Sequence, residues 1–137
     1  TEVCDDGNTA TWDGCNANCT VESGWTCSNT TGNTSVCEGI CGDGMLFGSE
    51  ECDDNNTMAW DGCGTNCTVE TGWNCSNTTG NTSVCVANCG DGMLYGTETC
   101  DDGNTASWDG CNSNCSVEVG WNCSNATGNT SMCSPVC

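Results

Sequence analysis

Aspartate and asparagine side chains gather in three short clusters, and these residues have the types and spacing that most clearly allow chemistry. Each cluster combines carboxylates with amide oxygens, which are hard ligands of the kind that Ca²⁺ takes about six to eight at a time. The spacing differs from an EF-hand loop, and the alternative is that the same residues form Asx turns with their own backbone. We expect structural Ca²⁺ with the ligands Asp5, Asp6, Asn8 and Asp13; Asp53, Asp54, Asn56 and Asp61; and Asp101, Asp102, Asn104 and Asp109.

A second set of side chains fits the acceptor pattern for N-linked glycans, Asn-x-Ser/Thr. Twelve asparagines match it, and five of them have Cys at the middle position, where disulfide formation can compete with glycosylation. The alternative is that these are polar turn residues, left bare in a bacterial host. We expect N-linked glycans in pairs on three polar loops, at Asn29 and Asn33, Asn77 and Asn81, and Asn125 and Asn129.

The composition excludes most other chemistry. The 137 residues include 19 acidic ones and no Lys, Arg or His, which gives a formal net charge of −19. Without cations the chain cannot contact nucleic-acid phosphates or an acidic membrane surface, and no apolar run approaches the roughly 20 residues that span a bilayer. Carboxylates are the only acid–base groups, and repeated acidic turns without a pocket suit a glycosidase poorly. We expect no enzymatic activity, no nucleic-acid partner and no membrane insertion.

Cysteine accounts for 18 of the 137 residues, far above the level that marks a small disulfide scaffold. Thiolate metal sites use C-x-C or C-x-x-C spacings, and neither occurs; the shortest spacing is C-x3-C. We expect disulfides and an oxidising compartment, with the pairing left open by the sequence. The cysteines concerned are Cys4, Cys15, Cys19, Cys27, Cys37, Cys41, Cys52, Cys63, Cys67, Cys75, Cys85, Cys89, Cys100, Cys111, Cys115, Cys123, Cys133 and Cys137.

Every cysteine recurs at a shift of 48 residues, so the chain consists of three copies of one six-cysteine repeat. We assign the repeats to residues 1–41, 42–89 and 90–137; the first lacks the heptapeptide Gly-Asp-Gly-Met-Leu-aromatic-Gly that opens the other two. A repeat of this size is too small to bury a self-sufficient core, so cross-links and stacking on neighbours must hold it. The register predicts a segment of a longer array.

Turn-forming residues fill the intervals between the cysteines, which predicts turns and short strands and little helix. The best hairpin candidate pairs residues 24–27 with residues 34–37. We predict small disulfide-rich tandem repeats, mostly turns and short β-hairpins, in an elongated linear array. One tryptophan of each repeat fits W-x-x-C, a pattern that carries mannose on the indole in some secreted repeats, but burial against a disulfide explains it more simply; these are Trp12, Trp60 and Trp108.

Several short motifs recur along the whole chain. Around the second repeat they read Cys41-Gly-Asp-Gly, Gly48-Ser-Glu50-Glu-Cys52-Asp-Asp, Asp61-Gly-Cys63 and Gly72-Trp73-Asn-Cys75. This pattern resembles the Myxococcus-type cysteine-rich repeat, also called the DUF4215 repeat. The resemblance implies tandem arrays in large extracellular surface proteins, and it implies no established activity.

These features together predict a secreted protein, extracellular or on the cell surface, with a structural role. We expect it to be disulfide-locked, calcium-binding and N-glycosylated, and to form part of a stalk, surface coat or glycan-coated fibril. Its partners would be copies of itself or further repeats of the same chain, joined end to end. The alternative is an adhesion or ligand-binding module, which should show exposed aromatic residues and one copy that departs from the others. The three copies differ only by small changes such as Phe47 to Tyr95.

Overall fold

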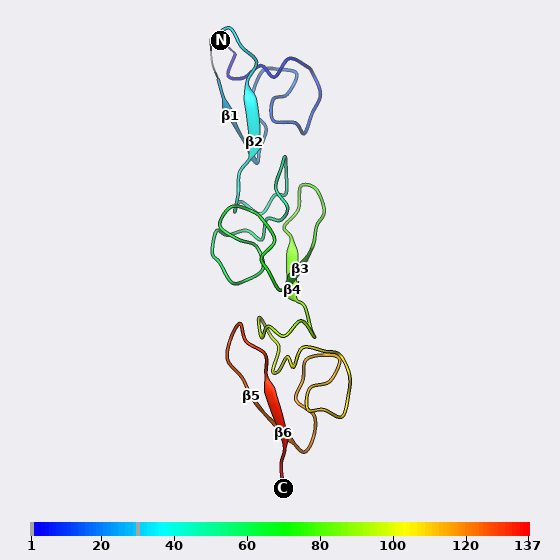
Figure 1. Ribbon diagram of the computed structural model, residues 1–137. Coiled ribbons are helices and arrows are strands. Elements are labelled where there is room, and N and C mark those ends of the chain that lie inside the picture. The colour runs from blue at the N-terminus through cyan, green and yellow to red at the C-terminus, as the bar shows by residue number, and fades with distance from the viewer. Residues whose placement is uncertain (1, 30) are drawn as a thin grey trace. The chain divides into compact units, whose positions relative to one another are not determined.

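The computed structural model describes residues 2–29 and 31–137, and the regular structure within them consists of three two-stranded hairpins (Figure 1). The part of the chain that is described contains no helix, and therefore none long and apolar enough to cross a membrane. The predicted class of small disulfide-rich repeats with short hairpins is confirmed. The strand pairs are β1 (Trp25–Ser28) with β2 (Val36–Gly39), β3 (Trp73–Ser76) with β4 (Val84–Ala87), and β5 (Trp121–Ser124) with β6 (Met132–Pro135).

The first hairpin is antiparallel and places Cys27 directly opposite Cys37. A disulfide joins these two residues, whose Cα atoms lie 4.1 Å apart. The loop between the strands turns at Gly32, where φ is +82°, a conformation that a residue without Cβ adopts easily. The hairpin predicted at residues 24–27 and 34–37 is confirmed, with strands that begin one and two residues later.

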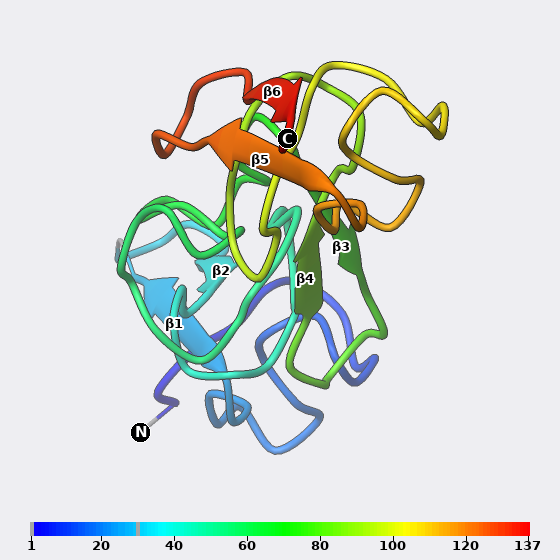
Figure 2. The ribbon, with the colours of Figure 1, turned by 90° about the horizontal axis from the view of Figure 1, so that it is seen from below.

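The residues form two compact units. The first contains Thr1–Ala59, Cys63–Val69 and Cys75–Val84, and the second contains Trp60–Gly62, Glu70–Asn74 and Cys85–Cys137. Residues of the predicted second repeat, 42–89, therefore occur in both units. Figure 2 shows that the short strands are flanked by long irregular loops. Half-cystines supply most of the fully buried side chains in each unit, so cross-links take the place of a large apolar core.

The disulfides follow one pattern in successive repeats. A first kind closes a loop of 11 residues, at Cys4–Cys15, Cys52–Cys63 and Cys100–Cys111. A second kind joins the strands of a hairpin, at Cys27–Cys37 and Cys123–Cys133. A third kind spans 26 residues and joins the last cysteine of one predicted repeat to the third cysteine of the next, at Cys41–Cys67 and Cys89–Cys115. Cys75 and Cys85 are also disulfide-bonded.

Two of the cysteines expected to form disulfides have no disulfide partner within this chain. Cys19 and Cys137 carry free thiols. Both occupy positions of the third kind of disulfide, which joins residues 26 apart. A partner 26 positions before Cys19 or after Cys137 would lie outside this chain, so the repeating pattern itself leaves these two cysteines unpaired.

Aromatic rings stack within each unit. Phe47 stacks against Trp12 and Trp25, with ring centroids 5.9 and 5.6 Å apart. The predicted burial of Trp12 and its copies against a disulfide is wrong, because the exposed fractions of Trp12, Trp60 and Trp108 are 68%, 72% and 88%, whereas that of Trp25 is 8%. We call Trp12, Trp60 and Trp108 the outer tryptophans, and Trp25, Trp73 and Trp121 the strand tryptophans, since the latter open β1, β3 and β5.

Candidate functional site

The loop that opens the second repeat wraps around the buried carboxylate of Asp53. One oxygen of Asp53 accepts hydrogen bonds from the backbone N–H groups of Gly42 (2.8 Å) and Asp43 (3.2 Å). The other accepts from Gly44 and Asn55, both at 2.9 Å. A carboxylate offers about four lone-pair positions, so the backbone occupies the full capacity of this side chain.

Asp101 holds the same loop in the third repeat. Its carboxylate accepts N–H groups from Gly90, Asp91, Gly92 and Gly103 at 2.8 to 3.2 Å. Asp53 and Asp101 are both fully buried. In the first repeat, Asp5 is exposed and accepts one such bond, from Gly7 at 2.9 Å. These three predicted Ca²⁺ ligands are thus placed as acceptors for their own loops.

A glutamate organises the neighbouring Trp-Asp-Gly segment, and the sequence does not reveal this role because the two lie 8 to 10 residues apart. In the first repeat Oε2 of Glu22 accepts the N–H groups of Trp12 (2.7 Å), Asp13 (3.0 Å) and Gly14 (3.0 Å). The equivalent residues Glu70 and Glu118 bind the equivalent segments. The glutamate fixes both the outer tryptophan and the aspartate that follows it.

Two aspartates of the first repeat, Asp6 in the cluster and Asp13 in the Trp-Asp-Gly segment, have oxygens that the backbone does not use. In the first repeat Oδ1 of Asp6 accepts the N–H of Asn8 at 3.2 Å, while Oδ2 of Asp6 and Oδ1 of Asp13 are buried without a hydrogen-bond partner. Oδ1 of Asp109 is in the same state in the third repeat. Burial raises the pKa of Asp102, and repulsion from Asp109 raises that pKa further, so the two carboxylates lie near each other.

The clustered asparagines form Asx turns. Oδ1 of Asn8, Asn56 and Asn104 accepts the N–H two residues ahead, at 2.6, 2.6 and 2.7 Å respectively. This geometry matches the alternative that we weighed against metal binding. The structure therefore brings Asp102 near Asp109 in the third cluster, while the first aspartate and the asparagine of the clusters serve the local backbone.

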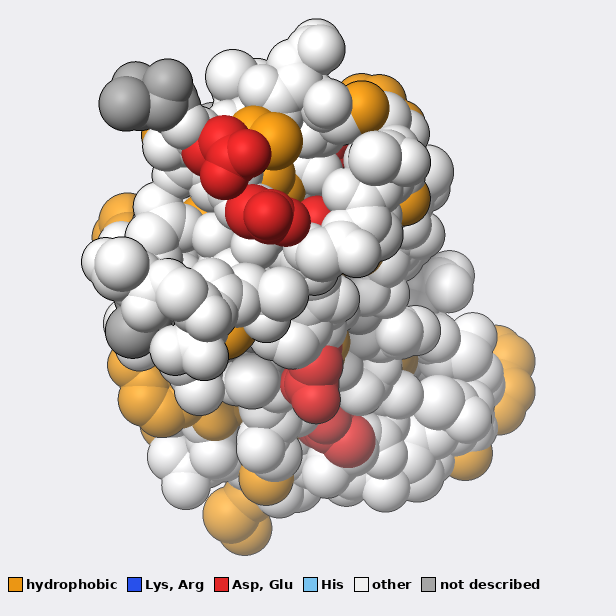
Figure 3. Space-filling model, turned by 90° about the horizontal axis from the view of Figure 1, so that it is seen from above, with side chains coloured by type: hydrophobic (Ala, Val, Ile, Leu, Met, Phe, Trp, Pro, Cys, Tyr) orange, Lys and Arg blue, Asp and Glu red, His pale blue; other side chains and the backbone are white. Residues whose placement is uncertain are grey.

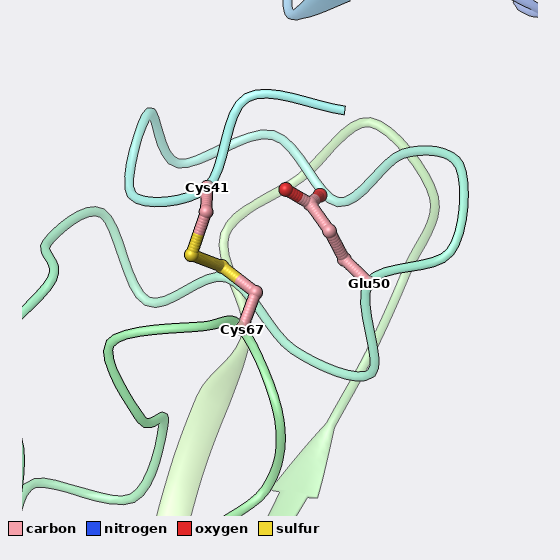
Figure 4. Close-up of side chains that lie close together, drawn as sticks. All are labelled: Cys41, Glu50 and Cys67. Carbon is pink, nitrogen blue, oxygen red and sulfur yellow. A yellow bond between two sulfur atoms is a disulfide. The ribbon is translucent and has the colours of Figure 1, made fainter. Parts of the chain in front are cut away.

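Carboxylates dominate the exposed ionisable groups. On the face that Figure 3 shows, acidic side chains gather with no basic side chain beside them. Among the described residues, the groups of three potential ligands that converge are Cys41, Glu50 and Cys67, and Cys89, Glu98 and Cys115. Each contains a disulfide (Figure 4), and a metal needs the thiolate form of cysteine, so neither group is a metal centre.

Glu50 has a partly buried carboxylate and is not among the predicted site residues. Its Oε2 accepts the N–H of Phe47 at 2.9 Å, and its Oε1 is buried without a hydrogen-bond partner. Figure 4 shows its side chain reaching toward the disulfide between Cys41 and Cys67. Burial raises the pKa of Glu50, and repulsion from nearby aspartates adds to this, against a smaller lowering by the N–H of Phe47. The motif Gly-x-Glu-x-Cys, which reads Gly48-Ser-Glu50-Glu-Cys52 here and recurs 48 residues later, is the sequence signal for this glutamate.

All six asparagines predicted to carry glycans are exposed. The first of each pair also has a structural contact: the amide nitrogens of Asn29, Asn77 and Asn125 donate at 2.5 Å to backbone oxygens 26 residues earlier. The side-chain amide of the second asparagine is less constrained in the second and third pairs. The amides of Asn81 and Asn129 donate only over 3.4 and 3.3 Å to carbonyls two residues before them.

Comparison with known proteins identifies one similarity. A family model described as a domain of unknown function, DUF4215, matches residues 21–68 and 64–116. The two matches overlap and together cover most of the chain, as expected for tandem repeats. No curated protein and no solved structure matches the chain.

Proposed function

The chain belongs to the DUF4215 family, and on that premise we propose that it is an extracellular structural repeat protein of a stalk, surface coat or fibril. The observation that carries the proposal is the third kind of disulfide. Cys41–Cys67 and Cys89–Cys115 tie each predicted repeat to the next. A cross-link that recurs with the repeat transmits tension along a chain without relying on a large apolar core. Disulfides of this density persist only in an oxidising compartment.

The first test of this proposal is enzymatic cleavage between repeats. The chain has no Lys or Arg, so trypsin cannot cut it, and a limited digest with a protease that cuts at Asp is used to obtain chains with a single cut. We expect cleavage within residues 42–66 to leave one species on a non-reducing gel and two after reduction. Separation without reductant would show that the repeats are not tied in this way.

Electron microscopy of native material provides the second test. We expect linear objects with an axial repeat that corresponds to one 48-residue unit. Compact, monodisperse particles without an axial repeat would contradict the stalk or fibril and favour a short binding module.

Calcium binding is part of the proposed function, and it rests on the spare aspartate oxygens. Asp6 and Asp13 in the first cluster have buried oxygens without hydrogen-bond partners, and Asp102 and Asp109 repel each other. A divalent cation would offset this repulsion, since two carboxylates with backbone carbonyls and water form a suitable oxygen shell. The equivalent sequence positions in the second repeat are Asp54 and Asp61.

The calcium proposal is tested by thermal melting with and without a chelator, at low salt. We expect Ca²⁺ at about 100 times its dissociation constant to stabilise the fold by about 2.7 kcal/mol per site. Asp109→Asn should abolish the calcium effect of its site, whereas Glu38→Gln, which removes one exposed charge from β2, should leave it intact. Equal melting with calcium and chelator would overturn the site.

N-linked glycans are the second part of the proposal, supported by the exposure of all six acceptor asparagines. We expect the second asparagine of each pair to be occupied more fully than the first, because the amide of the first holds a backbone carbonyl 26 residues away. Enzymatic deglycosylation in heavy-oxygen water followed by peptide mass spectrometry measures the occupancy of each site. Unmodified peptides from a eukaryotic host would contradict the proposal.

Adhesion or ligand binding is the alternative function, and one observation favours it. The outer tryptophans are exposed in all three repeats, which supplies the aromatic surface that an adhesive module needs. Replacing all three by Ala should then abolish attachment to cells or matrix while leaving the disulfides intact. Unchanged attachment would remove this alternative.

A further inference from the structure

The outer tryptophans are exposed although tryptophan has the largest of the apolar side chains. Trp12, Trp60 and Trp108 have exposed fractions of 68%, 72% and 88%. Full burial of an aromatic side chain of this size is strongly favourable, and one outer tryptophan recurs in each repeat. An exposed indole at the same position in every copy needs an explanation beyond packing.

The backbone at these positions is held in a conformation that large side chains rarely adopt. The φ angles of Trp12, Trp60 and Trp108 are +72°, +77° and +79°, in the left-handed region that favours glycine. Three hydrogen bonds to Glu22 hold the first of these segments in place. Strain of this kind concentrates at functional positions, and here its effect is to present the indole to the solvent.

The sequence around each outer tryptophan fits an acceptor pattern that the proposed function does not use. Each is followed three residues later by a cysteine, Cys15, Cys63 or Cys111, and so reads W-x-x-C. The strand tryptophans are followed by cysteine after two residues and read W-x-C. Three of the six tryptophans therefore match the W-x-x-C pattern, and the other three do not and serve as controls within the same chain.

We propose that Trp12, Trp60 and Trp108 are sites of C-linked mannose, attached to C2 of the indole by a mannosyltransferase that uses a polyprenyl-phosphate mannose donor. The π electrons of the indole form a carbon–carbon bond to the anomeric carbon of mannose. The bond from that carbon to the phosphate oxygen breaks, and its electron pair leaves with the polyprenyl phosphate. The proton on C2 then passes to a base of the transferase, which restores the aromatic ring. No serine, threonine or asparagine of this chain takes part.

The surface beside the outer tryptophans has room for a sugar. Trp12 lines a hollow of about 500 Å³ whose other walls include Phe47, Met45, Ser23 and Thr79. The apolar walls offer a face for the C–H groups of a pyranose, and the hydroxyls offer hydrogen bonds. A matching hollow of about 410 Å³ lies beside Trp60 and Tyr95 in the other unit. A mannose on the indole would cover the exposed ring with hydroxyl groups, so the modification also removes an apolar patch that would otherwise promote aggregation.

Peptide mass spectrometry tests the proposal on the chain secreted from eukaryotic cells that contain a C-mannosyltransferase and from matched cells that lack it. We expect the mass of one hexose on each peptide with an outer tryptophan and none on those with a strand tryptophan. A carbon-linked hexose fragments across its ring, whereas an O-linked one is lost whole. Unmodified outer tryptophans from the competent cells, equal modification of both classes, or loss of the intact hexose would each overturn the proposal.

A pair of variants tests the assignment to the pattern. Trp60→Phe should remove one hexose per chain and leave the other two, and Trp73→Phe, its partner in the same repeat, should remove none. If Trp73→Phe prevents secretion, its peptide from the unaltered chain provides the same comparison. An unchanged hexose count in Trp60→Phe would contradict the site. Calcium binding and N-glycosylation are measured on other residues, so the proposed function and this inference can fail separately.

Discussion

At the scale of single residues, this acidic chain uses several carboxylates as acceptors for its own backbone. Asp53 and Asp101 each collect four N–H groups, and Glu22 collects three on one oxygen. A carboxylate that accepts several N–H groups needs no basic partner. This explains how a protein without Lys or Arg places acids in its interior.

The first prediction concerns the buried carboxylate of Asp53. Asp53→Asn replaces one acceptor oxygen by an NH₂ group, which faces the backbone donors that this oxygen served. We expect the free energy of unfolding to fall by about 2–4 kcal/mol, because charge-assisted hydrogen bonds are lost and donors are left unsatisfied. Denaturant unfolding without reductant measures the change. Asp43→Asn is the control, since Asp43 accepts one local bond, from Met45; equal losses in the two variants would contradict the role of Asp53.

The second prediction concerns the pH dependence that Glu50 contributes. Burial raises the pKa of Glu50 in the folded protein above its ordinary value, so the folded state binds the proton more tightly than the unfolded state. The contribution to stability is full below the unfolded pKa of about 4.5 and is lost as pH rises through the folded pKa.

Glu50→Gln removes this dependence while keeping an oxygen that can accept the N–H of Phe47. We expect the melting temperature of the variant to fall less than that of the wild type as pH rises from about 4 to 7. Glu38→Gln, at an exposed position, is the control for the loss of one charge. Parallel pH curves for Glu50→Gln and the wild type would show that this carboxyl does not supply the dependence.

At the scale of the elements, the hairpins could be predicted because their signals are local. Residues 24–27 and 34–37 combine strand formers with a polar tip, and β1 and β2 lie within two residues of them. The cysteine pairing could not be predicted, because Cys41 and Cys67 meet through loops whose shape depends on the carboxylate of Asp53. The exposure of Trp12 was missed for a related reason, since it depends on hydrogen bonds to Glu22 rather than on hydrophobicity.

The third prediction uses two glycines with the same backbone requirement and different surroundings. Both Gly14 and Gly32 have positive φ, +112° and +82°. A Cβ on Gly14 would lie 2.2 Å from Cβ of Cys37, whereas one on Gly32 would meet nothing within 4 Å. We expect Gly32→Ala to cost about 1–2 kcal/mol for the backbone conformation alone and Gly14→Ala to prevent native pairing of Cys27 with Cys37. Disulfide mapping and melting measure both, and equal behaviour would contradict the close packing of this loop on the hairpin.

At the scale of the whole molecule, the pattern of disulfides recurs with the same 48-residue period as the sequence. Disulfides within each repeat fix its local shape, and those of the third kind join one predicted repeat to the next. The 48-residue period was evident from the cysteines, but the linkage between repeats was not, because a sequence period is compatible with pairing inside each copy. The linkage is what makes the proposed structural role a mechanical one.

The last prediction is therefore mechanical. With Cys41–Cys67 intact, a pulling force passes directly between these two residues, and the loop between them stays hidden. In the double variant Cys41→Ser, Cys67→Ser, the force passes along the backbone between residues 41 and 67. Residues 52–63 are not extended, because the Cys52–Cys63 disulfide still joins their ends. The variant releases about 15 residues, 11 before Cys52 and 4 after Cys63, and at about 3.3–3.6 Å per extended residue it adds roughly 50 Å.

Single-molecule force spectroscopy between the chain ends measures this length. The free thiols of Cys19 and Cys137 should be replaced by Ser in every sample, so that no exchange occurs during pulling. The double variant Cys27→Ser, Cys37→Ser is the control, because it opens a hairpin loop with a sequence separation of 10 and should add about 35 Å by the same rule. A variant at Cys41 and Cys67 that adds no length would mean that this disulfide does not carry tension. The stalk or fibril would then have to derive its strength from contacts other than these cross-links.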